Sequence, residues 1–144
     1  MSQRTIRTII EDQEPVTAPA TLTVSEAARL MKEHRVGAIM VVQEDTLVGI
    51  FTERDALIRV LAEGCDVQAT RLADVMTRNP RTIHPDKSFA EALQMMYGGS
   101  FRHVPVVEDG RPVGMVSARD ALGPELEAFV YELLRQEQIG EILA

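Results

Sequence analysis

Gly49-Ile50-Phe51-Thr52-Glu53-Arg54-Asp55 is the stretch that decides the fold, because Gly114-Met115-Val116-Ser117-Ala118-Arg119-Asp120 repeats its pattern 65 residues later. In both stretches an apolar run ends at a hydroxyl residue, and an aspartate stands three positions further on. This spacing is the capping box that begins a helix. The start of a helix also favours an anion, and an aspartate there can accept hydrogen bonds from two neighbouring hydroxyl groups. The pattern predicts either a plain helix cap or a site for a ribose and its phosphate.

The similarity extends outward from these two stretches into a tandem repeat. Residues 24–57 align with residues 89–122 at a constant offset of 65, without a gap. The identical pairs include Glu26/Glu91, Ala27/Ala92, Met31/Met96, Val41/Val106 and Val42/Val107. Chance similarity rarely keeps one register over a whole unit, so the chain is a tandem duplication.

Each copy predicts the same order of elements. Thr23 and Ser88 stand three residues before a glutamate and predict helix starts, and Gly98-Gly99 predicts the end of the later helix. Apolar runs on either side of a polar turn then predict a hairpin in each copy, over 38–42 with 47–51 and over 104–107 with 112–116. A helix over 53–62 follows the first hairpin. Short strands are expected at 16–17 and 81–83.

These elements give a fold class and boundaries. The expected fold is α+β, an α/β-type repeat in which two β-α-β-β-α units pack face to face with pseudo-twofold symmetry. The expected segments are a lead-in over 1–14, a first repeat over 15–69, a second repeat over 70–123 with a joining helix at 70–76, and an amphipathic C-terminal helix over 124–144. One stripe of that helix is apolar, which suits packing on its own domain or dimerisation: Leu126, Phe129, Val130, Leu133 and Leu134.

Composition narrows the class of function. The 144 residues are 45% hydrophobic and carry a net charge of −7, which argues against nucleic-acid binding. Apolar runs are too short to span a membrane, and the single cysteine, Cys65, suits a reducing compartment, so a cytoplasmic location is expected. The three histidines show no metal-ligand spacing, and no nucleophile stands beside a base, so neither a metal site nor an enzyme is expected.

The chain resembles the CBS (cystathionine β-synthase) domain family, and specifically a tandem CBS pair, or Bateman module. The resemblance rests on the two Gly-x-x-[Thr/Ser]-x-x-Asp stretches, on Val75-Met76-Thr77-Arg78-Asn79-Pro80, and on Phe101-Arg102-His103-Val104-Pro105-Val106. It covers about residues 15–123 and is most like the short free-standing bacterial CBS-pair proteins. It implies clefts between the copies that bind AMP, ADP, ATP, NAD(H) or S-adenosylmethionine as regulatory ligands, with no catalytic cofactor. It also implies a homodimer and an unidentified protein target.

The resemblance also assigns residues to these clefts. Asp55 and Asp120 would hold ribose hydroxyl groups, and Thr52 and Ser117 would hold ribose or phosphate oxygens. The adenine would lie in one cleft against Thr17, Ala18, Gly37, Ala38 and Met40, and in the other against Thr82, Ile83, Arg102, His103 and Pro105. Arg54 and Arg119 could reach phosphates, although a first-turn arginine is as often simply solvated.

Two alternatives stay open at this point. If both aspartates serve only as helix caps, the chain is a ligand-free packing or dimerisation module. If the clefts bind ligands, the grouping of Arg102, His103 and Arg119 in the second copy predicts that the Asp120 cleft binds phosphorylated ligands more tightly. That second expectation assumes that each cleft is built from one copy.

Overall fold

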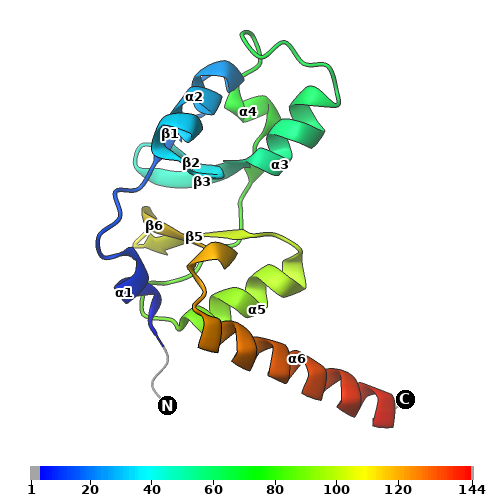
Figure 1. Ribbon diagram of the computed structural model, residues 1–144. Helices are drawn as coiled ribbons and strands as arrows, with labels where there is room; N and C mark the ends of the chain where they lie inside the picture. The colour runs from blue at the N-terminus through cyan, green and yellow to red at the C-terminus, as the bar shows by residue number, and fades with distance from the viewer. Residues whose placement is uncertain (1–3, 144) are drawn as a thin grey trace.

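The two repeat units stack with their sheets facing each other and their helices on the outside (Figure 1). The structure is a computed structural model that describes residues 4–143, with side chains except at 123–124 and 138–143. The first unit contains β1 (Thr17–Pro19), α2 (Val24–His34), β2 (Ala38–Gln43), β3 (Thr46–Thr52), α3 (Glu53–Asp55) and the π-helix η1 (Ala56–Leu61). The predicted fold class is confirmed.

Within the described residues, the second unit repeats the helix and the hairpin at equal lengths but has no first strand and only a short second helix. It contains α5 (Phe89–Gly99), β5 (His103–Glu108), β6 (Arg111–Ser117) and the 3-10 turn η2 (Ala118–Asp120). Its second helix therefore ends after one turn, whereas the first unit continues through η1. The long helix α6 (Gly123–Leu143) follows, with Pro124 in its first turn, where a proline is tolerated.

The predicted hairpins and helix starts are confirmed. β2 pairs antiparallel with β3, and β5 with β6, each with one register shift at equivalent places. Thr23 and Ser88 cap α2 and α5 by accepting hydrogen bonds from the amides of Glu26 and Glu91.

One predicted strand is absent from the described residues, and one predicted helix end needs a detail added. Residues 81–83 do not form a strand, because only Ile83 bridges to β5, whereas β1 forms a parallel pair with β2. The predicted end of the later helix at Gly98-Gly99 is confirmed, although neither glycine takes the left-handed conformation. The helix runs through Gly99, and Ser100 closes it in the left-handed conformation.

The helix before each unit packs on the other unit. The joining helix α4 (Leu72–Val75) places Leu72 and Val75 in the core of the first unit, with Phe51 and Ile39. The lead-in helix α1 (Ile6–Ile10) packs in the core of the second unit, with Phe89 and Val116 among its partners. The lead-in is thus the structural counterpart of the joining helix, and each short helix completes the core of the unit other than the one that follows it in the chain.

The C-terminal helix extends away from the second unit (Figure 1). Near its start, Phe129 packs edge-to-face on Tyr97 of α5, with the ring centroids 6.0 Å apart. Further members of its apolar stripe are exposed: Leu126, Val130 and Leu134. None of the described helices is long and apolar enough to cross a membrane.

Candidate functional site

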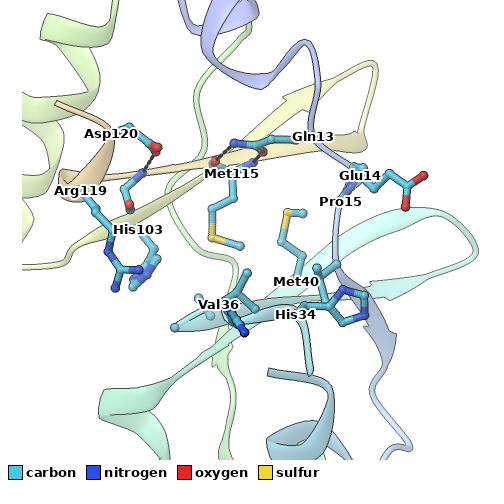
Figure 2. Close-up of a pocket in the computed structure, with 15 residues that line it drawn as sticks. Gln13, Glu14, Pro15, His34, Val36, Met40, His103, Met115, Arg119 and Asp120 are labelled. Carbon is cyan, nitrogen blue, oxygen red and sulfur yellow. Dashed lines mark hydrogen bonds between the residues drawn. The ribbon is translucent and has the colours of Figure 1, made fainter. Parts of the chain in front are cut away.

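Two clefts lie between the facing units, one at each copy of the aspartate motif. The Asp120 cleft has a volume of about 330 Å³, and Figure 2 shows it. Its lining is Gln13, Glu14, Pro15, Val16, His34, Arg35, Val36, Gly37, Ala38, Met40, His103, Met115, Ser117, Arg119 and Asp120. The Asp55 cleft has a volume of about 620 Å³. Its lining is Ile50, Thr52, Glu53, Arg54, Asp55, Ile58, Arg59, Thr77, Asn79, Pro80, Arg81, Ser100, Phe101, Arg102 and His103.

Each cleft is built from both units. Ser117 and Asp120, at the end of β6, share a cleft with Gly37, Ala38 and Met40 of the first unit. Thr52 and Asp55, at the end of β3, share the other cleft with Arg102 and His103 of the second unit. The sequence-based grouping by copy is therefore wrong. Because the sheets face each other, the end of one hairpin lies opposite the start of the other.

Asp55 is a buried helix-capping residue. Its Oδ2 accepts a hydrogen bond from the Thr52 amide at 3.0 Å, and its own amide donates to the Thr52 hydroxyl at 3.1 Å. The Thr77 hydroxyl lies 3.3 Å from Oδ1, and the Arg59 guanidinium lies 3.5 Å from the same oxygen. The capping box predicted from the sequence is therefore present and uses Oδ2, while Thr77 and Arg59 engage Oδ1.

Asp120 has fewer partners. Its Oδ2 accepts a hydrogen bond from the Ser117 amide at 2.7 Å. Within the described part of the chain, no side-chain hydrogen bond or ion pair engages its Oδ1, and the residue is only half-buried. The second copy of the motif thus offers an acceptor that the first copy has already used.

The motif glycines allow the preceding short helices to approach the strands. A Cβ at Gly114 would lie 2.8 Å from the Cβ of Ile10, at the end of α1. A Cβ at Gly49 would lie 2.5 Å from the sulfur of Met76, just after α4. At both glycines the end of a short helix packs directly on the strand. A side chain at either position would collide with it, which explains why the motif begins with glycine.

The CBS domain model matches residues 6–62 and 72–124, and therefore both units. The chain belongs to the CBS-domain family. A crystal structure of the CBS domain protein PAE2072 from Pyrobaculum aerophilum, complexed with AMP, is 26% identical with a TM-score of 0.77, over 89% of this chain and 98% of that one. The CBS domain pair of protein MJ0100, in complex with methylthioadenosine and S-adenosyl-L-methionine, is 30% identical with a TM-score of 0.74, over 83% and 93%.

A curated relative from Arabidopsis thaliana, the CBS domain-containing protein CBSCBSPB1, is 37% identical over 108 residues. That alignment covers 74% of this chain and 20% of the relative. The CBS pair is therefore a small part of that longer protein.

Five of the residues assigned from the family resemblance line neither cleft: Thr17, Ala18, Thr82, Ile83 and Pro105. Three of them are buried in the two CBS units, namely Ala18, Ile83 and Pro105. Thr82 instead faces a separate hollow of about 440 Å³ beside α5. The remaining assigned residues all line one of the two clefts, and His103 lines both.

Sequence reasoning missed lining residues that the repeat itself could have supplied. Glu14, Pro15 and Val16 line the Asp120 cleft, and Asn79, Pro80 and Arg81, at the same offset of 65, line the Asp55 cleft. The sequence signal for these segments is the repeat offset itself, which relates residues 14–16 to residues 79–81.

The side chain of Gln13 replaces a strand in the second CBS unit. In the first unit, β4 (Thr77–Arg78) pairs with β3 through Gly49 and Ile50. In the second unit, the Gln13 amide group donates to the Met115 carbonyl and accepts from the Met115 amide, both at 3.0 Å (Figure 2). Gln13 is the position equivalent to Arg78 of β4. Its side-chain amide therefore makes, with the main chain of β6, hydrogen bonds like those that the main chain of β4 makes with β3.

The two clefts differ in charge. Four arginines and two carboxylates line the Asp55 cleft: Arg54, Arg59, Arg81, Arg102, Glu53 and Asp55. Two arginines and two carboxylates line the Asp120 cleft: Arg35, Arg119, Glu14 and Asp120. Within the described part of the chain, the guanidinium groups of Arg81 and Arg102 make no ion pair. Because Arg102 lies in the Asp55 cleft, the expectation that cations gather around Asp120 loses its basis.

His103 stands between the two clefts at the start of β5. Burial lowers its pKa from the ordinary 6.5; Arg102 and Arg119 lower it further, whereas Glu53 and Asp120 oppose this effect. The imidazole is therefore mainly neutral at neutral pH and offers one N–H donor. Within the described residues, no group of three or more His, Cys, Asp or Glu side chains is placed to hold a metal ion.

Proposed function

We propose that this CBS pair is a regulatory module, without catalysis of its own, that binds adenosine-containing nucleotides in the two clefts. AMP, ADP, ATP and NAD(H) are the candidate ligands, and their binding would relay energy or redox state to a partner protein or through an oligomer. The observation that carries the proposal is the placement of Asp55 and Asp120. Each stands at the start of a helical turn, beside an arginine, in a cleft formed by both units.

The Asp120 cleft suits a nucleoside. The carboxylate keeps Oδ1 available for ribose hydroxyl groups, and a charged acceptor makes stronger hydrogen bonds than a neutral one. Apolar side chains of Met40, Met115 and Val36 line the same cleft and could pack on a base (Figure 2). The relatives support this use, since the two solved structures named above were obtained with AMP and with adenosine derivatives of S-adenosylmethionine type.

A ligand-free packing module is the second candidate, and the environment of Asp55 favours it for that cleft. Its carboxylate is buried, with three partners from the chain itself. A ribose would have to share these oxygens with Thr52, Thr77 and Arg59. On this alternative, Asp55 stabilises the first unit and binds nothing.

We also propose a homodimer. Large apolar side chains are exposed on η1 and α5, and further ones on α6: Leu57, Ile58, Leu61, Tyr97, Leu126, Val130 and Leu134. Burying such surface in a second copy is favourable at roughly 25 cal/mol per Å². Light scattering at high concentration tests the assembly, and a strict monomer would contradict it.

The two clefts can be tested separately by methyl NMR. Met40 and Met115 line the Asp120 cleft, whereas Ile50 and Ile58 line the Asp55 cleft, and the described lining of neither cleft contains the other residue type. The experiment titrates protein labelled at methionine and isoleucine methyl groups with adenosine, AMP, ATP and NAD+. We expect saturable shifts of the Met40 and Met115 signals with AMP.

Two controls make this test decisive. Deoxy-AMP should bind roughly 1–3 kcal/mol more weakly, because one carboxylate lone pair loses its hydroxyl partner. Asp120→Asn should weaken AMP binding at the methionine signals and leave the isoleucine signals unchanged. If no adenosine compound shifts either set at millimolar concentration, the packing-module alternative is correct.

A further inference from the structure

Arg4 connects the residue that carries the Asp120 carboxylate to the C-terminal helix. Its Nη2 donates to the main-chain carbonyl of Asp120 at 2.7 Å. The same guanidinium grips Glu125 with two hydrogen bonds, of 2.5 Å from Nη2 and 3.0 Å from Nε. Such a fork is the most directional pairing available between two charged side chains.

Both residues of this ion pair, Arg4 and Glu125, make further contacts that fix their positions. The Arg4 carbonyl accepts a hydrogen bond of 2.9 Å from the Phe89 amide at the start of α5, and its guanidinium lies 5.5 Å from the Phe89 ring centroid. Glu125 also accepts a hydrogen bond of 2.9 Å from the Leu122 amide. The hydrogen bond from Arg4 lowers the pKa of Glu125, so the pair stays charged at neutral pH.

The covalent structure of residue 124 explains why Asp120 needs this partner. In a continuing helix, the Asp120 carbonyl would accept from the amide four residues later. That residue is Pro124, which has no N–H group. In addition, Ala121 is extended, so the helical turn ends there. Arg4 supplies the donor that the helix lacks, and thereby satisfies a carbonyl that would otherwise have no partner in the helix.

Among the residues that the structure describes, the first unit has no such link. At the offset of 65, Ala69 stands where Arg4 would be expected, and Val60 stands where Glu125 would be. There, α3 continues directly into η1, so the helix satisfies its own carbonyls. The link therefore belongs to one cleft only, and the two clefts can serve as internal controls for each other.

We propose that Arg4 couples the Asp120 cleft to the C-terminal helix. By holding the Asp120 carbonyl and Glu125 on one guanidinium, Arg4 makes the orientation of the Asp120 turn and the position of α6 depend on each other. Arg4 is a positioning residue and does not line the cleft. The part of this proposal that concerns a ligand rests on the proposed function. Coupling between two sites is reciprocal, so if the position of α6 affects AMP binding, AMP in the Asp120 cleft also stabilises the start of α6.

The first test needs no ligand. Amide hydrogen exchange of the full chain is compared between wild type, Arg4→Gln and Arg7→Gln. Arg7 lies on α1 and pairs with Asp86 and Glu108, so its variant removes an equal charge from the same segment without touching Asp120. We expect about tenfold faster exchange over residues 118–130 in Arg4→Gln only. Unchanged exchange there, in a protein that melts like wild type, would overturn the proposal.

The second test uses AMP and the methyl signals. Arg4→Gln should weaken binding at Met40 and Met115 about tenfold and leave any binding at Ile50 and Ile58 unchanged, whereas a general loss of folding would affect both sets. Glu125→Gln should behave similarly, and the double variant should be no worse than Arg4→Gln, since the residues act as a unit. Arg4→Lys should restore part of the binding.

These outcomes separate the two ideas. Equal AMP affinity in wild type and Arg4→Gln would overturn the coupling and leave the proposed function intact. If AMP binds to neither cleft of the wild type, the proposed function fails, and hydrogen exchange in the ligand-free protein still decides whether Arg4 holds Asp120 to α6. If Arg4→Gln does not fold, Glu125→Gln takes its place in both tests.

Discussion

The Asp55 and Asp120 clefts occupy equivalent places in the duplicated chain but present different chemistry. Both are lined by an equivalent segment, residues 14–16 or 79–81, by the start of one hairpin and by the end of the other. The Asp55 cleft has Arg81 and Arg102 at the positions where the Asp120 cleft has Val16 and Gly37. The repeat thus keeps the backbone geometry of a site, while a few side chains on the wall decide its charge. Similar fold does not imply a similar ligand.

The motif aspartates differ in the same way. Asp55 is 8% exposed and bonded by three groups of its own unit, whereas Asp120 has one such carboxylate contact and depends on Arg4 for its carbonyl. One copy of the motif therefore has both carboxylate oxygens engaged by the chain, whereas the other, within the described residues, has only Oδ2 engaged. The alternatives left open by the sequence thus need not have the same answer in both copies.

The largest expected effect concerns polyphosphates. If the Asp55 cleft binds a nucleotide, Arg81 and Arg102 should favour ATP over AMP there. Replacing them with the residues of the other cleft, Arg81→Val and Arg102→Gly, should weaken ATP about a hundredfold, because two charged hydrogen bonds are lost at about 1.5 kcal/mol each. Calorimetry at several salt concentrations measures this, with Arg111→Ala in the hairpin turn as control. Equal binding of ATP and AMP by the wild type would count against it.

The motif glycines should differ in their tolerance of a methyl group. Gly114→Ala should lower the free energy of unfolding by about 2–3 kcal/mol, because its Cβ meets the Cβ of Ile10, close to the backbone. Gly49→Ala should cost about 1–2 kcal/mol, because the Met76 sulfur can move although the Thr77 carbonyl at 3.0 Å cannot do so easily. Urea unfolding measures both.

Gly98→Ala is the matched control for these glycines. A Cβ at this position in α5 would have no atom within 4 Å. It should stabilise the protein by about 0.5–1 kcal/mol, the usual gain of alanine over glycine in a helix. Equal losses at all three glycines would show that the close approach of α1 and α4 is not what excludes a side chain.

The two aspartates should contribute unequally to stability. Asp55→Ala should cost about 2 kcal/mol, since it removes a cap and leaves Thr77 without its carboxylate partner. Asp120→Ala should cost about 1 kcal/mol, the value of one half-buried helix cap. Thermal melts of ligand-free protein compare them. A larger loss for Asp120→Ala would reverse the roles assigned to the two copies.

The smallest effect is a pH dependence at His103, between the clefts. Because burial lowers its pKa, the unfolded chain binds more protons than the folded one as the pH falls through 6.5. The free energy of unfolding should therefore decrease between pH 7.5 and 5.5. His103→Gln should flatten this slope. Measuring above pH 5.5 avoids the titration of Glu108 and Glu125, whose pKa values lie below the ordinary 4.5. An identical slope in the variant would show that other groups carry the dependence.

Local features were the part that the sequence predicted well. The helix starts at Thr23 and Ser88 depend on a side chain and an amide three residues apart. The hairpins depend on apolar runs joined by short turns, in which Glu44, Asp45 and Asp109 accept positive φ angles. Such features involve neighbours along the chain, so spacing alone is sufficient. The end of α5 is also informative: Gly98-Gly99 marks it, but Ser100 takes the left-handed conformation that glycine commonly supplies after a helix.

The sequence by itself determined the duplication, the order of elements in each unit, and the capping aspartates, because each rests on a repeated spacing of a few residues. Only the tertiary structure decided which halves of the two units share a cleft, which core each short helix completes, and that Arg4 meets Asp120. Thr52 and Arg102, which share a cleft, are 50 positions apart in the chain, and Arg4 and Asp120 are 116 apart. Such contacts depend on how two sheets pack face to face, and no local pattern of side chains encodes that geometry.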